Sequence, residues 1–327
     1  MSETILITAS SFDEQTYGPV CKILEDRGYE TVVYKTDRVL SGEDNFTLHQ
    51  PGDGSISMHY NGVSILPEQI SAAWYRKLGA FTVRDADEQL SKQLHMNNEI
   101  RALHDNVWSF YPDELWLNAP QKLQKADRKL NQLIVANEIG FKVPETVLSS
   151  DWEEISDRLL DSNDGQMIMK MMRGVISENN QIKVFYAAIA DRQKVSELME
   201  GTVPFPGIYQ SYAEKFREWR VTVVGDNVFP AAIYTERHAK DDWRKHQLTS
   251  AVEFKEGELP DRIGSNCVAY LGKMGLRYGA FDLVENSDGE ITFLECNPNG
   301  EYGWLEQALG FPISEAIANE LIAIAAS

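Results

Sequence analysis

The sequence has few of the residues on which small extracellular folds and zinc sites depend. It contains three cysteines, Cys21, Cys267 and Cys296, an odd number without metal-ligand spacing. We therefore expect neither a disulfide framework nor a zinc site. No apolar run reaches the roughly 18 residues that a transmembrane helix needs, and the first residues lack the basic segment of a signal peptide. These absences predict a cytoplasmic protein.

Basic side chains are also scarce relative to acidic ones. The 327 residues include 31 Lys and Arg against 50 Asp and Glu, which gives a formal net charge of −19. A field of this sign repels a phosphate backbone and an anionic bilayer, so we expect neither nucleic acid nor a membrane as a partner. A chain of this length buries about three quarters of its unfolded surface, which favours two or three domains over one.

Several catalytic motifs are missing as well. The turn after the first apolar strand, residues 9–13, has no glycine-rich fingerprint, which argues against a bound dinucleotide. The chain has neither a Walker A sequence nor a Gly-x-Ser-x-Gly elbow, and its six histidines show no spacing typical of a triad. We therefore expect no nicotinamide cofactor and no separate nucleophile.

Apolar periodicity predicts an α/β domain that opens as a βαβ unit, followed by mixed helices and antiparallel strands. In the first part we expect strands at 5–7, 31–34 and 70–75, helices at 18–27 and 85–108, and a hairpin at 46–63. Beyond it we expect helices at 127–139, 151–160, 191–200, 261–274 and 314–325, a loop at 235–249, and strands at 146–148, 167–172, 182–190, 208–212, 219–224, 228–234, 279–284 and 291–295.

Oxygen ligands gather on the last two predicted strands. Glu295 and Asn297 are two residues apart and so share one side of a strand, and the tight turn at 286–289 can bring Asp282 alongside. Two carboxylates and an amide oxygen suit Mg²⁺, which completes its shell with water and phosphate oxygens. The alternative is a solvated hairpin end, but so apolar a strand would not usually interpose such groups without a partner.

Two lysines are candidates for holding an anion. Lys170 lies in the apolar run 167–172, where an unpaired charge is costly and a phosphate would remove that cost. The alternative for Lys170 is a side chain that snorkels from an edge strand. Lys129 lies among the other basic residues of a predicted helix, so a solvated basic face is its default interpretation.

These features resemble the ATP-grasp superfamily, in which two α+β lobes clasp ATP. The resemblance implies an α/β and α+β fold with a βαβ domain at 1–118, a central lobe at 119–205 and a C-terminal lobe at 206–327. It also implies ATP and Mg²⁺, with two ions expected. By resemblance, Lys129 and Lys170 are the phosphate- and adenine-side lysines, Gln210 and Tyr212 border the adenine, Glu218 contacts the ribose, Arg220 lies near the transferred phosphate, and Asp282, Glu295 and Asn297 bind the metal.

Within the superfamily the chain is most similar to the graspetide synthetases, the macrocyclases of microviridin-type ribosomal peptides. The matching segments are 33–38, 73–76, 242–245 and 295–306. The resemblance implies an ADP-forming ligase that phosphorylates Asp or Glu side chains and joins them to Ser or Thr as esters, or to Lys as amides. It implies a precursor peptide with a leader and an acid-rich core as the partner, docking of the leader on the hairpin 168–190, and a homodimer.

Three questions stay open at this level. The loop 235–249 offers Arg237 and Arg244 as anchors for a substrate carboxylate, although a basic run is usually a solvated face. Tyr302 and Trp304, which flank the metal motif, could border the site or pack the last helix. The alternatives in function are an amino-acid ligase of the type that glutamylates a ribosomal protein, and a non-catalytic ATP-binding module.

Overall fold

The computed structural model of the chain describes residues 3–77, 89–160, 166–170, 175–178, 181–184, 188–191, 193, 207–235 and 252–327. Residues 236–249 of the expected loop and nearly all of the expected helix at 191–200 lie outside these residues, and residue 235 ends a strand. Among the described helices, none is long and apolar enough to cross a membrane.

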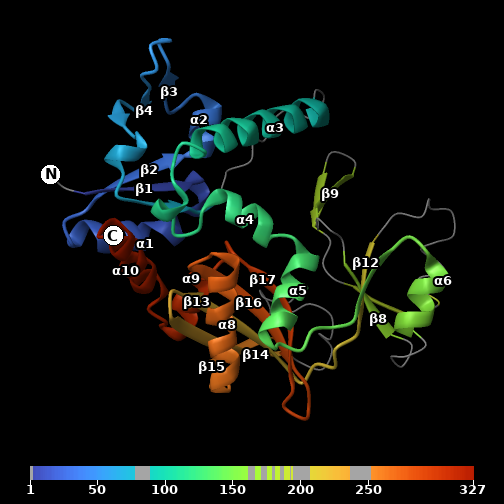
Figure 1. The fold of residues 1–327 in the computed structure, drawn as a ribbon. Helices are drawn as coiled ribbons and strands as arrows, with labels where there is room; N and C mark the ends of the chain where they lie inside the picture. The colour runs from blue at the N-terminus through green and yellow to red at the C-terminus, as the bar shows by residue number, and fades with distance from the viewer. Residues whose placement is uncertain are drawn as a thin grey trace.

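The N-terminal domain is built on a parallel sheet in the order β2-β1-β6 (Figure 1). The expected βαβ opening is confirmed by β1 (Thr4–Ala9), α1 (Glu14–Asp26), β2 (Glu30–Lys35) and the parallel pairing of β1 with β2. Successive residues of β1 face opposite sides, so Ile5 and Ile7 pack toward α1 whereas Leu6 packs toward α3 (Gln89–Trp108). The remaining elements here are α2 (Thr36–Ser41), β3 (Phe46–His49), β4 (Ser57–Tyr60), β5 (Val63–Ser64), β6 (Ala72–Tyr75) and the 3-10 turns Ser11–Asp13, Pro67–Gln69 and Asp113–Leu115.

The middle of the chain forms a four-stranded antiparallel sheet in the order β11-β8-β12-β7. Its members are β7 (Thr146–Ser149), β8 (Gln166–Lys170), β11 (Ala188–Asp191) and β12 (Gly207–Ser211). Helix α6 (Trp152–Ile155) and the π-helical segment Ser156–Leu160 that continues it pack on this sheet. The prediction of a single strand at 182–190 was wrong. The described residues there belong to two strands, because β10 (Gln181–Val184) pairs with β9 (Val175–Glu178) whereas β11 pairs with β8.

The C-terminal lobe is a five-stranded antiparallel sheet in the order β15-β14-β13-β16-β17. One face carries Trp219, Val221 and Phe281 into an apolar core with three helices. The elements of this core and sheet are α4 (Pro120–Ala126), α5 (Lys129–Ile139), α8 (Asp261–Met274), β13 (Arg217–Val224), β14 (Asn227–Thr235), β15 (Val252–Glu256), β16 (Tyr278–Glu285) and β17 (Ile291–Asn297). Helix α9 (Gly303–Leu309) follows the sheet.

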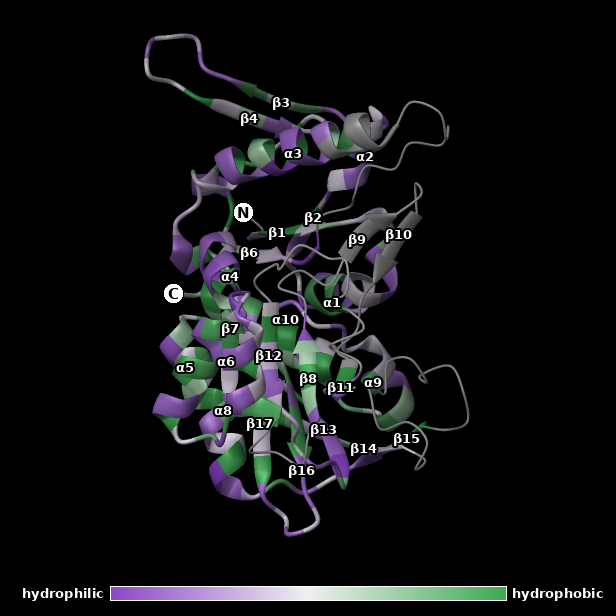
Figure 2. Cartoon of the chain, turned by 90° about the vertical axis from the view of Figure 1, so that its right-hand side faces the viewer, coloured by the Kyte–Doolittle hydropathy of each residue, from purple (hydrophilic) through white to green (hydrophobic). Residues whose placement is uncertain are grey.

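Helix α10 (Ile313–Ala325) joins the C-terminal lobe to the N-terminal domain. One apolar cluster contains Ile5 of β1, Val20 of α1, Ile317 and Leu321 of α10, and Val224 of β13. Figure 2 shows the hydrophobic α10 between the N-terminal sheet and the strands of the C-terminal lobe. The two ends of the chain therefore share a core, which fixes the N-terminal domain against the opposite face of the five-stranded sheet.

The division into domains at 118/119 and 205/206 stays a prediction. Strand β12 begins at Gly207, yet its hydrogen-bonded neighbours are β7 and β8 of the preceding segment. By its pairing, β12 thus belongs to the four-stranded sheet.

Candidate active site

A row of charged side chains crosses three strands of the five-stranded sheet. Arg220 of β13 is in register with Asp282 of β16, and Asp282 is in register with Glu295 of β17. Directly opposed residues of antiparallel strands point to the same face, so the three side chains are neighbours. Arg220 Nη1 lies 2.9 Å from Asp282 Oδ1, and both residues are buried. The expected proximity of Asp282 and Glu295 is thus confirmed, whereas their roles stay predictions.

Lys129 extends this row from the helix that covers the sheet edge. It is the first residue of α5, and its Nζ lies 2.9 Å from Glu295 Oε2. The default interpretation of Lys129 as part of a solvated basic face is wrong, because the side chain is half-buried and paired with a predicted metal ligand. The pairs Arg220–Asp282 and Lys129–Glu295 balance two negative charges with two positive ones.

Two further predicted residues lie beside the row. Glu218 is two residues before Arg220 on β13 and so faces the same side, where Lys215 Nζ donates to its Oε1 at 2.9 Å. Asn297 ends β17, two residues after Glu295, and its exposed side chain accepts a hydrogen bond from the main-chain N–H of Asn299 at 3.0 Å. The Asn297 amide thus lies at the exposed end of β17, with its oxygen hydrogen-bonded to the following loop.

The predicted adenine-side residues lie on the other sheet. Lys170 ends β8, where it is half-buried and in register with Ile208 of β12. Gln210 of β12 is buried, and its Nε2 donates to Thr146 Oγ1 at 2.9 Å. Tyr212 directly follows β12, and burial raises the pKa of its phenol. Figure 1 shows the four-stranded and five-stranded sheets on either side of α5, so the two lobes contribute separate parts of the predicted site.

The two predicted carboxylate anchors lie in a segment outside the described residues. Arg237 and Arg244 lie in the segment 236–251, outside the described residues, as do parts of the predicted leader dock at 168–190. Their roles stay predictions.

The donor set of the row fits Mg²⁺ better than a closed metal cage. Among the residues that the structure describes, no three His, Cys, Asp or Glu side chains gather in a group that could hold a metal ion. Two carboxylates with one amide oxygen leave positions for water and phosphate oxygens, which is the arrangement that Mg²⁺ prefers. Cys296 lies between Glu295 and Asn297 in the sequence, but its thiol faces the apolar core. Because burial raises the pKa of this thiol, Cys296 is not a candidate metal ligand.

A second cluster, which the sequence did not reveal, supports the loop after β17. Arg76, 1% exposed at the side chain, has its Nη2 2.5 Å from Glu301 Oε2 and its Nε 2.9 Å from Asp13 Oδ2. Its Nη1 donates to the main-chain oxygen of Asn299 at 2.6 Å. One guanidinium from the end of β6 thus holds two carboxylates and the backbone that follows the metal motif.

Glu301 remains charged in this cluster. Burial alone would oppose its ionisation, but the charge of Arg76 and a hydrogen bond from Lys77 hold the pKa of the carboxyl below its usual range. This contact joins the segments 73–76 and 295–306, both of which carry the resemblance to the graspetide synthetases.

Two aromatic residues near the site have packing roles. Tyr302 is fully buried, and its hydroxyl donates to the main-chain oxygen of Thr16 at 2.9 Å. The ring of Trp304 packs on Phe254 of β15 with centroids 4.6 Å apart. Of the two alternatives for Tyr302, bordering the site or packing, packing is therefore the correct one. The side chain connects the start of α9 to α1.

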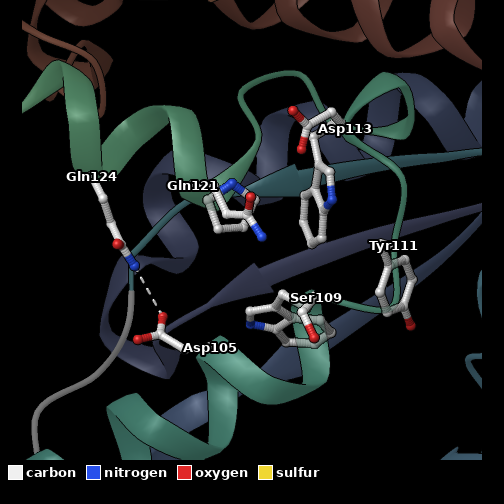
Figure 3. Close-up of a pocket in the computed structure, with 9 residues that line it drawn as sticks. Asp105, Ser109, Tyr111, Asp113, Gln121 and Gln124 are labelled. Atoms are coloured by element: carbon white, nitrogen blue, oxygen red, sulfur yellow. Dashed lines mark hydrogen bonds between the residues drawn. The ribbon is translucent and has the colours of Figure 1, made fainter.

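A pocket of about 210 Å³ lies elsewhere, between α3 and α4 (Figure 3). Gln124 of α4 donates to Asp105 of α3 at 3.1 Å across it. Its other lining residues are Trp108, Ser109, Tyr111, Asp113, Trp116, Pro120 and Gln121. Because none of the predicted site residues lines this pocket, we do not assign the nucleotide to it.

No family model matches the sequence, and no curated protein matches it. Among solved structures, the macrocyclase MdnC of Microcystis aeruginosa MRC, bound with the precursor peptide MdnA, is 27% identical with a TM-score of 0.81, over 98% of this chain and 99% of that one. A RiPP-associated ATP-grasp ligase of Chryseobacterium gregarium, in complex with ADP and a leader and core peptide, is 26% identical with a TM-score of 0.84, over 98% and 97%.

A third structure shows likeness of the fold alone. The ATP-grasp ligase PsnB, complexed with a phosphomimetic variant of its minimal precursor, Mg and ADP, is 20% identical with a TM-score of 0.73, over 99% of both chains.

Proposed function

We propose that this chain, an ADP-forming ATP-grasp ligase of the graspetide-maturing kind, closes rings in a ribosomal precursor peptide. The expected fold is confirmed by the likeness to MdnC and to the Chryseobacterium gregarium ligase over almost the whole chain. One observation carries the proposal for this chain's own residues. The strand register aligns Arg220, Asp282 and Glu295 across three strands, and Lys129 lies beside Glu295. Charges of both signs therefore meet on one face of the sheet.

In this proposal Asp282, Glu295 and Asn297 hold Mg²⁺, and we expect two ions. Bound there, Mg²⁺ would neutralise part of the charge of the nucleotide phosphates. Arg220 and Lys129 already lie next to the metal carboxylates, so the same cations can balance phosphate oxygens without a large rearrangement.

The nucleotide itself is proposed to lie between the lobes. By the resemblance, Lys129 and Lys170 are the phosphate- and adenine-side lysines, Gln210 and Tyr212 border the adenine, and Glu218 contacts the ribose. In the structure Thr146 orients the Gln210 amide and Lys215 orients the Glu218 carboxylate, which supports fixed positions for both groups. The ADP in the Chryseobacterium gregarium complex supports a nucleotide as the ligand.

The proposed reaction activates a peptide carboxylate, which is a poor electrophile at neutral pH. The γ-phosphoryl group passes from ATP to a carboxylate oxygen of a core Asp or Glu, giving ADP and an acyl phosphate. A Ser or Thr hydroxyl, or a Lys amine, then attacks the acyl carbon, loses its proton and displaces phosphate. The peptide loses one water for each bond, and the chain supplies positioning and charge neutralisation, with Arg237 and Arg244 proposed as anchors for the carboxylate.

The proposed partner is a precursor peptide with a leader and an acid-rich core. Two similar structures support such a partner: MdnC is bound with a precursor peptide, and the Chryseobacterium gregarium ligase is in complex with a leader and core peptide. Docking of the leader on residues 168–190, a homodimer and a cytoplasmic location remain parts of the same proposal.

The test is co-expression with the short acidic open reading frame expected beside the gene, followed by intact mass of the peptide. Loss of one or more waters, absent with the Glu295→Gln variant, supports macrocyclisation. A gain in mass would favour an amino-acid ligase of the glutamylating type instead, and an unchanged peptide without ADP release would favour a non-catalytic ATP-binding module.

A further inference from the structure

Strand β17, which carries two of the proposed metal ligands, is the edge strand of its sheet. The outward backbone groups of an edge strand need partners other than a neighbouring strand. At one position the Phe293 N–H donates to the main-chain oxygen of Lys142 at 2.8 Å. At Cys296, both backbone groups bind a side chain instead.

That side chain is the amide of Gln132 from α5. The Cys296 N–H donates to Gln132 Oε1 at 3.1 Å, and Gln132 Nε2 donates to the Cys296 oxygen at 2.8 Å. Nε2 also donates to the main-chain oxygen of Ala126 at 2.7 Å. Gln132 is 4% exposed, so both amide hydrogens and the amide oxygen are used in a site closed to water.

We propose that Gln132 is a positioning residue for the metal ligands. Cys296 stands between Glu295 and Asn297, and the alternation of a strand sends its side chain into the core while its two neighbours point to the opposite face. Holding both backbone groups of Cys296 therefore fixes the main chain from which both ligands leave. This inference rests on the proposed function, because it takes these residues as the metal site.

The position of Gln132 on its helix adds to the argument. Gln132 is three residues after Lys129 on α5, and residues at this spacing share a helix face. Lys129 contacts the Glu295 carboxylate while Gln132 contacts the next residue's backbone. One helix face thus sets both the charge and the backbone position of the metal ligand.

A second buried amide holds the other side of Asn297. Asn118 Nδ2 donates to the main-chain oxygens of Pro298 and Tyr278, each at 2.9 Å. The two residues that flank Asn297 are therefore both held by buried amides, Cys296 by Gln132 of α5 and Pro298 by Asn118, which precedes α4.

The experiment compares the Mg²⁺ dependence of ADP binding, measured by calorimetry, in the unaltered chain and in Gln132→Met. Methionine fills a similar volume without polar groups. Loss of a contact that orients metal ligands commonly weakens metal binding by about 10- to 100-fold, so we expect the Mg²⁺ concentration for half-maximal ADP binding to rise at least about tenfold. Gln132→Glu, which keeps the acceptor for the Cys296 N–H but loses both donors, should raise it as well.

The control is Val135→Ala, which loosens the packing of α5 in the core without touching β17 through polar groups. It should lower the melting temperature and leave the Mg²⁺ midpoint unchanged. If the Gln132 variants lose thermal stability but keep the parental midpoint, Gln132 only anchors the helix and the inference is overturned. If the unaltered chain itself shows no Mg²⁺-dependent ADP binding, the proposed function is wrong. The measurement on the unaltered chain therefore distinguishes failure of the proposed function from failure of the inference about Gln132.

Discussion

The main-chain oxygen of Glu301 accepts a hydrogen bond from Arg220 Nη2 at 3.3 Å, while the Glu301 side chain pairs with Arg76 of the N-terminal domain. The residue proposed to lie near the transferred phosphate therefore depends on a loop that another domain holds in place. This relationship makes the N-terminal domain a structural part of the site.

Removal of the Arg76 guanidinium should be strongly destabilising. Arg76→Leu leaves the Asp13 carboxylate, 11% exposed, without its counter-charge, whereas Glu301 keeps its pair with Lys77, so we expect a loss of about 3 kcal/mol in the free energy of unfolding, measured in urea. The matched control is Arg27→Leu, which breaks an exposed pair with Glu315 and should change stability by about 1 kcal/mol or less. Equal effects of the two substitutions would contradict this account.

A methyl group at Gly300 should disturb Arg220 directly. A Cβ at this position would lie 2.6 Å from Arg220 Nη2 and 2.5 Å from Ala280 Cβ, so the loop at Gly300 and the Arg220 guanidinium have to shift relative to each other. We expect Gly300→Ala to lower kcat by about tenfold or more, because a small displacement of a positioning group is costly to the rate. Gly303→Ala, where a Cβ meets nothing within 4 Å, should keep kcat near the parental value. Parental kcat in Gly300→Ala would rule out this role of the loop.

Lys129 should matter for nucleotide binding more than for stability. Its pair with Glu295 is partly exposed, so Lys129→Met should change the unfolding free energy by about 1 kcal/mol or less. The same substitution removes a cation from the proposed phosphate site, and we expect the Kd for ATP to rise about tenfold in calorimetry. Lys142→Met, which breaks the exposed pair with Glu290, serves as the control and should leave the Kd unchanged. An unchanged Kd in Lys129→Met would remove Lys129 from the nucleotide site.

Mild acid should destabilise the N-terminal domain through His104. Burial lowers the pKa of this imidazole to about 4, against an ordinary value near 6.5 in the unfolded chain. The unfolded state therefore binds the proton first, and stability is lost as the pH falls from about 6.5 to about 4, by roughly 3 kcal/mol in total. Urea unfolding at a series of pH values measures this slope, and His104→Phe should flatten it. An equally steep slope in that variant would assign the pH dependence to other groups.

Local pattern was enough to predict the elements that carry most of the proposed metal site. The period of a strand places Glu295 and Asn297 on one side, and a tight turn brings Asp282 into register, as observed in the pairing of β16 and β17. Strand β15 and helix α9 were missed. Strand β15 is mostly exposed and rich in charge, so it lacks the apolar alternation on which strand prediction depends.

The sequence by itself therefore determined which residues share a strand face and which chemistry they favour, because these depend on a period of two and on short turns. Only the tertiary structure decided that Lys129 meets Glu295, 166 residues away, that Gln132 holds Cys296, and that Arg76 reaches Glu301. These contacts follow from how α5 packs on the edge of β17 and how α10 joins the two ends of the chain. Such packing depends on many apolar side chains at once, so the spacing of residues within one element does not predict it.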